Sequence, residues 1–230
     1  MDINAKQKLN NALNVTLTVL LGIAVFVFII TFSIGLPIYC RFFYYAQINA
    51  LEIPEITGES YSAIKQAYDQ VLDFLTLRNK PFGTGVFKYS AEGASHFADC
   101  KGLFTLNTVA LILSTIITAL LLTLNKFKVI ALKKPFGFGV AFTSAVSIFI
   151  FIAIIGGLVA IDFDKAFTIF HKLFFPGKEN WQFDPYFDQI ILALPEQFFL
   201  NCAILIGASV VILSVGIIVF ELIRKKRLSK

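Results

Sequence analysis

Four long stretches of the chain contain no Asp, Glu, Lys or Arg, and they constrain the fold more than any other feature. They are residues 9–40, 102–125, 135–161 and 197–220. Even the shortest would form a helix about 36 Å long, which exceeds the roughly 30 Å hydrocarbon core of a bilayer. A backbone in lipid must satisfy its own hydrogen bonds, so these segments are expected to be helical. The sequence therefore predicts an all-α membrane protein with four transmembrane helices.

The distribution of charge predicts the orientation of these helices. The two tails and the short loop 126–134 carry eleven basic residues, and the only acids near them are Asp2 and Glu221. The longer segments 41–101 and 162–196 carry nine basic and thirteen acidic residues. Because positive residues favour the cytoplasmic side, both termini and the short loop are expected to be cytoplasmic.

The two long segments are then expected to face outward and to form a small extracellular cap. The spacing of Ile64, Tyr68, Leu72 and Leu75 predicts an amphipathic helix, with Glu59 and Ser60 near its start. Residues 86–89 are predicted to be extended, and residues 164–175 to form a helix that ends at Pro176-Gly177. The predicted order is cytoplasmic tail 1–8, helix 9–40, cap 41–101, helix 102–125, cytoplasmic loop 126–134, helix 135–161, cap 162–196, helix 197–223 and basic cytoplasmic tail 224–230.

The three cysteines give no disulfide framework, because their number is odd. Cys40 and Cys100 fall near outer helix ends, where a bond between them is possible in principle, and Cys202 is interpreted as a packing residue. Cys100 also lies four residues after His96, which raises the alternative of an activated thiol nucleophile. The first hydrophobic stretch is too long for a signal peptide and is expected to be a retained helix.

Several classes of function are disfavoured by the sequence. It contains no H-E-x-x-H, no G-x-S-x-G and no glycine-rich phosphate loop, so neither a nucleotide nor another cofactor is expected. The basic residues flank helices and form no separate domain, which disfavours nucleic acid as a partner. The apolar stretches lack ionisable side chains, which disfavours an ion-coupled transporter. Nothing in the spacing of the two histidines and Asp99 selects a zinc site.

The chain has only two histidines, His96 and His171, and both lie in polar segments just outside the apolar stretches. Histidine is the side chain whose unperturbed charge changes nearest physiological pH. The pair therefore suggests acid–base chemistry on a lipid at the membrane interface. Chance placement of two scarce residues is the alternative.

Two motifs carry a resemblance to a known family. They are F-H-x-L-F-F-x-G…W-x-F-D…D-x-I-I…P-E-x-F-F, from Phe170 to Phe199, and S-H-F-A-D-C-K, from Ser95 to Lys101. Together with the four-helix pattern, they resemble the lipoprotein intramolecular transacylase family, Lit. In this chain, Phe97 stands where an aliphatic residue or Met is expected, and Cys100 where Val is expected.

The resemblance implies a four-helix membrane enzyme with an extracellular cap and no cofactor. Its substrates would be diacylglyceryl-modified bacterial lipoproteins. The enzyme would move the sn-2 acyl chain to the α-amino group of the N-terminal cysteine, giving the lyso form. The resemblance implies that His96 and His171 are the catalytic pair. The alternatives are a membrane hydrolase that uses the same histidines and a non-enzymatic membrane partner.

Supporting residues are predicted from their positions near the histidines. Asp99 is a candidate to orient His96, and the alternative is an exposed acid paired with Lys101. Asp184 and Asp188 are candidates to orient His171, and the alternative for both is helix capping. The aromatic residues near the motifs are candidates to line a dry substrate pocket, the alternative being packing against headgroups. They are Phe170, Phe174, Phe175, Trp181, Phe183, Tyr61 and Tyr68.

Overall fold

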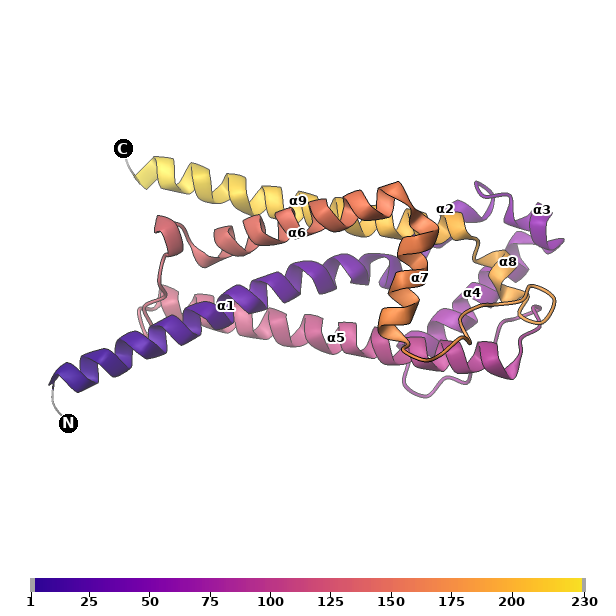
Figure 1. Cartoon of the computed structure of the whole chain (residues 1–230), viewed down its shortest axis with the longest axis horizontal. Helices are drawn as coiled ribbons and strands as arrows, with labels where there is room; N and C mark the ends of the chain where they lie inside the picture. Colours follow the sequence, from indigo (N-terminus) through magenta and orange to yellow (C-terminus); the bar gives the residue numbers. More distant parts are fainter. Residues whose placement is uncertain (1–2, 229–230) are drawn as a thin grey trace. The chain divides into compact units, whose positions relative to one another are not determined.

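The computed structural model describes residues 3–228, and every regular element in that range is a helix (Figure 1). Four helices are long and apolar enough to cross a membrane: α1 (Ile3–Tyr39), α5 (Ala91–Lys126), α6 (Val140–Ile161) and α9 (Glu196–Leu228). This confirms the predicted all-α membrane protein with four transmembrane helices. The ends of the two predicted tails, residues 1–2 and 229–230, lie outside the described residues.

The third long helix begins five residues later than the hydrophobic stretch suggests. Pro135–Gly137 forms a short 3₁₀ turn, η1, and α6 starts only at Val140. Phe136 and Gly137 both adopt left-handed backbone conformations, with φ of 55° and 76°. Hydrophobicity alone marked these residues as part of the span, whereas their backbone conformation places them in the preceding turn.

The chain forms two compact units, and the first is built from parts of the four long helices and the loop that joins α5 to α6. It contains the residues up to Ser33, Val109–Ile155 and the residues from Gly207 onward. Its apolar core includes Ile29, Ile148 and Val210. Buried hydroxyl groups in this unit donate to backbone carbonyls, as Ser144 Oγ does to the oxygen of Gly22 at 3.0 Å. Such bonds satisfy polar groups where water is scarce.

The second unit contains Ile34–Thr108 and Gly156–Ile206. Both predicted cap segments, 41–101 and 162–196, fall within it. Its shorter helices are α2 (Arg41–Ile48), α3 (Ile53–Thr57), α4 (Tyr61–Thr76), α7 (Phe163–Phe174) and α8 (Ile190–Ala193). The pattern of the sequence predicted neither α2 nor α3.

Helix α4 provides much of the apolar core of the second unit. The Ser60 hydroxyl accepts a hydrogen bond from the backbone N–H of Ala63 at 3.2 Å and caps the start of the helix. The apolar stripe predicted for this helix is buried, which confirms its amphipathic pattern. The ring of Tyr68 stacks on Tyr44 with centroids 3.9 Å apart, a contact worth about 0.5–1.5 kcal/mol beyond burial. The Tyr44 hydroxyl donates to the oxygen of Ala193, which joins α2 to α8.

Residues 86–89, predicted to be extended, instead belong to a turn and the coil after it. Gly85 has a φ of 60°, and a Cβ there would lie 3.0 Å from the Cα of Ala67. Only glycine fits this conformation and this close approach. The Thr84 hydroxyl donates to the carbonyl oxygen of Phe87 at 2.6 Å and holds the turn.

The start of α5 is fixed by a buried carboxylate from a distant part of the chain. Asp188 accepts hydrogen bonds from the backbone N–H of Ser90 at 2.8 Å and from its hydroxyl at 2.9 and 3.0 Å. The Ser90 hydroxyl in turn accepts from the N–H of Gly93 at 2.9 Å. These bonds satisfy donors that a helix N-terminus leaves free. They also fix the turn of α5 that precedes His96.

Gly93→Ala is expected to disrupt this anchor. A Cβ at Gly93 would lie 2.1 Å from Asp188 Oδ1 and 2.8 Å from its Cγ, so the carboxylate would have to move. We expect a loss of about 1–3 kcal/mol of stability, measured as a lower midpoint of thermal unfolding in detergent. Gly102→Ala in the same helix meets no atom within 4 Å and serves as the control, with an expected change from zero to a gain of about 1 kcal/mol. Equal midpoints for the two variants would contradict the importance of the anchor.

Candidate active site

His96 lies in the second turn of α5 and is almost fully buried, with 6% of its surface exposed. Its Nε2 atom lies 3.3 Å from the sulfur of Cys100, one helical turn further along. Its Nδ1 atom is buried and has no hydrogen-bond partner among residues 3–228. Leaving a buried polar atom unpaired costs free energy, so the missing partner of this nitrogen requires an explanation.

His171 comes from α7, a short helix that begins directly after Asp162 (Figure 1). Asp162 caps α7 by accepting from the N–H of Lys165 at 2.9 Å. The helix ends before Pro176, as predicted, and Gly177 continues the chain with a φ of 74°. Both ends of this helix are therefore defined by local residues that fix the position of His171.

The hydrogen bond of His171 fixes its tautomer. Nδ1 lies 2.8 Å from the carbonyl oxygen of Phe167, and because a carbonyl oxygen can only accept, Nδ1 carries a proton. In the neutral ring, Nε2 therefore holds the free lone pair. Burial lowers the pKa of His171, and the hydrogen bond to Phe167 opposes this only in part. The imidazole is thus neutral at pH 7 and able to accept a proton at Nε2.

The two imidazole rings face the same aromatic environment. Their centroids lie 5.7 Å apart. Trp181 stacks on His171 with centroids 4.7 Å apart, and Phe175 and Phe183 lie edge-on to His96 at 5.0 and 5.4 Å. The fold thus brings together two histidines that are 75 positions apart in the sequence and surrounds them with apolar rings.

Both histidines line one cavity of about 330 Å³, which lies entirely within the second unit. Beyond the histidines, almost all of its wall is apolar, as is typical of pockets that bind small molecules. The wall includes residues from the ends of three membrane-crossing helices. These are Ile34, Pro37, Ile38, His96, Phe97, Cys100, Leu103, Phe104, Phe198, Phe199, Cys202 and Ile206.

Comparison with known proteins places the chain in a family. The sequence profile of the lipoprotein intramolecular transacylase family, Lit, matches residues 19–199. The chain belongs to the Lit family. It is therefore a membrane-integral acyltransferase of the lipoprotein intramolecular transacylase type. No curated protein sequence matches it.

Solved structures of a Lit protein share the fold. The in meso structure of Lit from Bacillus cereus has a TM-score of 0.83 and 25% identity, covering 95% of this chain and 99% of that one. Two variants of the same protein, with one histidine replaced by arginine or alanine, have TM-scores of 0.79 and 0.76 at 24% identity. The match to the arginine variant covers 100% of both chains. The alanine variant covers 97% of this chain and 99% of its own.

In this Lit family member, Asp99 does not pair with Lys101. Its carboxylate forms an ion pair with Lys178 and accepts a hydrogen bond from Asn180 Nδ2 at 3.2 Å. The Lys101 ammonium instead donates to the oxygen of Leu77 at 3.1 Å and lies over the ring of Phe74. The pairing with Lys178 spans 79 positions of sequence, so local spacing could not reveal it.

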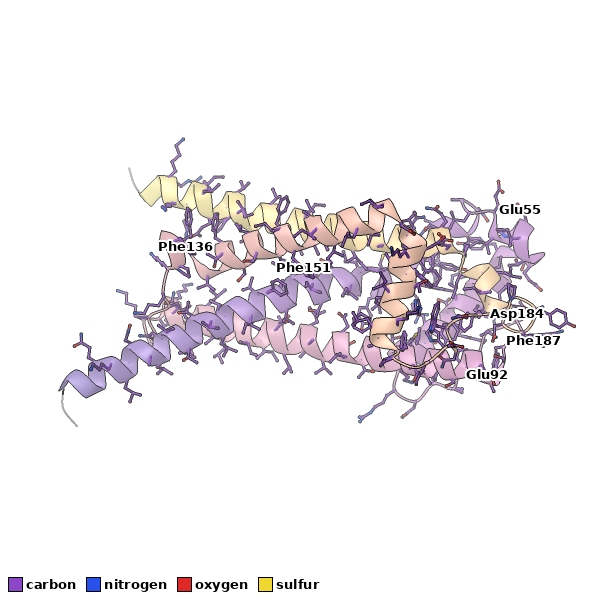
Figure 2. All side chains as sticks on the ribbon, in the orientation of Figure 1. Glu55, Glu92, Phe136, Phe151, Asp184 and Phe187 are labelled. Atoms are coloured by element: carbon purple, nitrogen blue, oxygen red, sulfur yellow. The ribbon has the colours of Figure 1, made fainter. Side chains whose placement is uncertain are left out.

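Asp184 and Asp188, the other two acids predicted to lie near the histidines, do not have the surroundings expected of a partner of His171. Asp188 anchors the start of α5, which matches the helix-capping alternative. Asp184 accepts from the N–H of Tyr186 at 2.8 Å and stabilises an exposed turn. Figure 2 shows Asp184 close to Phe187 on the surface of the loop before α8. The ring nitrogen of His171 that has a partner is instead bonded to Phe167.

Most of the predicted aromatic residues line the cavity, but two do not. Phe170, Phe175, Trp181, Phe183 and Tyr68 are part of its wall. Phe174 lies outside the wall, is 46% exposed and packs on Phe170 with centroids 4.7 Å apart. Tyr61 is also exposed, and its hydroxyl donates to the oxygen of Tyr45 at 3.4 Å. Both residues belong to helices whose other faces contact the core.

Among residues 3–228, the cysteines form no disulfide bond and the acidic residues belong to no group that could hold a metal ion. All three cysteines are free, so the possible bond between Cys40 and Cys100 is absent. Cys100 and Cys202 line the cavity, whereas Cys40 is exposed. Among residues 3–228, no three His, Cys, Asp or Glu side chains are grouped so that they could hold a metal ion. The Asp99 carboxylate is already paired with Lys178.

Proposed function

We propose that the chain moves the sn-2 acyl chain of a diacylglyceryl lipoprotein to the α-amino group of its N-terminal cysteine, with His96 and His171 as the catalytic pair. The observation that carries this proposal is the pair of buried imidazoles, with centroids 5.7 Å apart, in an apolar cavity. Conversion of an ester into an amide is downhill, so the reaction needs no nucleotide. The products are the lyso lipid and the N-acylated cysteine of the same molecule.

His171 is the general base in this mechanism. The α-amino group has a pKa of about 7.7–8.0 and is largely protonated at neutral pH, when it cannot attack. The neutral fraction of the amine attacks the ester carbonyl, and the free lone pair on Nε2 of His171 accepts the proton that this nitrogen loses as the C–N bond forms. Nδ1–H remains bonded to Phe167, which keeps the ring oriented during the transfer. The lowered pKa of His171 keeps the acceptor neutral.

His96 stabilises the tetrahedral oxyanion. If the Cys100 thiol donates to Nε2, then the neutral ring carries its proton on Nδ1, the nitrogen that has no partner in the protein. This N–H donates to the carbonyl oxygen as negative charge develops there. The tetrahedral intermediate then collapses, and the glyceryl oxygen leaves with a proton that it receives from the histidine pair.

The cavity contributes by positioning one substrate molecule against itself. The amine and the sn-2 carbonyl belong to the same lipoprotein, and holding them together removes about 7–11 kcal/mol of barrier in favourable cases. The rings of Phe175, Trp181 and Phe183 surround the imidazoles and exclude the water that would hydrolyse the ester.

The charge distribution supports a location of the site on the outer face of the cell membrane. Both termini and the loop 126–134 would be cytoplasmic, by the excess of basic residues there. The partners would then be diacylglyceryl-modified bacterial lipoproteins and membrane lipid, with neither nucleotide nor nucleic acid involved.

The pH dependence should separate the two titrating groups. Acyl transfer requires the amine and His171 to be deprotonated together, so log(kcat/KM) should rise with slope one below about pH 7.7, the pKa range of the amine. Because the pKa of His171 is lowered from its ordinary 6.5, the slope should steepen to two only below pH 6.5. Initial rates on a synthetic diacylglyceryl lipopeptide would measure this. A slope of two beginning above pH 6.5 would contradict a neutral, desolvated base.

Mass spectrometry of a lipoprotein's N-terminal peptide tests the function. Cells that make only diacylglyceryl lipoproteins would express the chain. Fragmentation should then show one acyl group on the amine and an unchanged total mass. Loss of a whole acyl mass, with release of free fatty acid, would identify a hydrolase instead. An unmodified peptide would favour a non-enzymatic partner.

A further inference from the structure

Asn180 presents a buried oxygen that the protein leaves without a partner. The side-chain Oδ1 of Asn180 has no hydrogen-bond donor among residues 3–228, although the atom is buried. Leaving a buried acceptor unpaired costs about 1–3 kcal/mol. The catalytic scheme above does not use this residue. Its oxygen is therefore a feature of the fold that still requires an explanation.

The orientation of the Asn180 amide is fixed by its neighbours. Nδ2 donates to Asp99 Oδ2 at 3.2 Å and to Ser95 Oγ at 3.5 Å. A carboxylate can only accept, so the nitrogen of the amide must face Asp99 and the oxygen must face away. Lys178 occupies the other oxygen of the Asp99 carboxylate, which holds the arrangement in place and balances its charge.

Asn180 is connected to both histidines through its immediate neighbours. Ser95, which accepts from Asn180, directly precedes His96 on α5. Trp181, the next residue in the chain, stacks on His171 and lines the cavity. The side chain of Asn180 therefore contacts the turn of α5 that carries His96, and the next residue in the chain contacts His171.

We propose that Asn180 binds the α-amino group of the substrate's N-terminal cysteine through Oδ1. This inference rests on the proposed function, in which that amine attacks the ester. A carbonyl oxygen accepts one N–H of the neutral amine and leaves the nitrogen lone pair free for attack. Because the amide is uncharged and Asp99 is paired with Lys178, the contact orients the amine and favours its unreactive ammonium form less than an unpaired carboxylate at this position would.

Binding of two unreactive analogues tests the contact. Both are diether analogues of the diacylglyceryl lipopeptide, one with the N-terminal amine and one with hydrogen in its place. For the wild-type chain in nanodiscs, loss of the amine should weaken binding about tenfold. In Asn180→Ala the same comparison should give less than about a twofold difference, because the acceptor is absent. The ratio of the two dissociation constants cancels any general weakening of the site.

Gln182→Ala is the matched control, since Gln182 is an exposed amide two residues further along the same loop. It should keep the wild-type ratio. Asn180→Asp keeps an oxygen at the position and should retain or increase the preference for the amine, which provides a second test if Asn180→Ala does not fold. A wild-type chain that does not distinguish the analogues would overturn the proposal, as would an unchanged ratio in Asn180→Ala or a lost preference in Asn180→Asp.

Failure of the proposed function would be visible separately. A wild-type chain that releases free fatty acid, or leaves the ester lipopeptide unchanged, contradicts the transacylation. A wild-type chain that transfers the acyl group, but binds both diether analogues equally, contradicts the role of Asn180 alone.

Discussion

His171→Ala is expected to reduce acyl transfer about 10²–10⁴-fold, the usual contribution of a positioned general base. The variant loses the lone pair on Nε2, which the hydrogen bond between Nδ1 and Phe167 leaves free. Initial rates on a diacylglyceryl lipopeptide would measure the loss. The steep limb of the pH profile below pH 6.5 should also disappear, because no second group then has to lose a proton.

Phe170→Leu provides the control for His171→Ala. Phe170 lines the same cavity from the same helix and contacts the ring of His171, but it carries no ionisable group. We expect it to retain most of the activity and the steep limb. Near-normal rates in His171→Ala would refute the role of His171 as the base.

His96→Ala is expected to lower kcat about 10²–10³-fold, the loss that follows removal of one oxyanion donor. The effect should fall on kcat more than on KM, because the contact strengthens only as charge develops on the carbonyl oxygen. His96→Gln offers an uncharged N–H donor and should restore part of the rate. Single-turnover measurements with saturating enzyme would separate the chemical step from binding.

Two results would contradict the role of His96 as an oxyanion donor. A variant whose KM rises while kcat is unchanged would show that the imidazole contributes only to uniform binding. Failure of His96→Gln to exceed His96→Ala would remove the argument for an N–H donor. The unfolding midpoints of both variants should stay close to the wild-type value for the comparison to apply.

The membrane helices could be predicted from sequence because their signal is local and strong. Uncharged runs longer than the bilayer core leave few alternatives. The helix around Tyr68 was also predictable, since its apolar residues recur at helical spacing. Helices α2 and α3 are short, and Glu52 between them adopts a left-handed conformation with a φ of 53°. Such brief elements depend on contacts with the rest of the unit, which a sequence pattern does not contain.

The candidate site was predicted only in part, for a related reason. The aromatic residues near His171 were visible because they cluster in the sequence. The cavity residues Ile34, Leu103 and Ile206 resemble any other residue of a membrane-spanning helix, so nothing local distinguishes a wall residue from one that faces lipid. The ion pair of Asp99 joins residues that are 79 positions apart, and the anchor made by Asp188 joins residues that are 98 positions apart. Spacing arguments reach only one or two helical turns.

The stacking of Trp181 on His171 has a spectroscopic consequence. The chain contains a single tryptophan, so its tryptophan fluorescence originates entirely from an indole that stacks on the proposed base. A positive charge that appears on the imidazole acts directly on the indole π system. Emission from the unlabelled protein therefore reports the protonation of His171, and a lipopeptide that enters the cavity changes the same signal. The protein thus carries its own optical probe of catalysis.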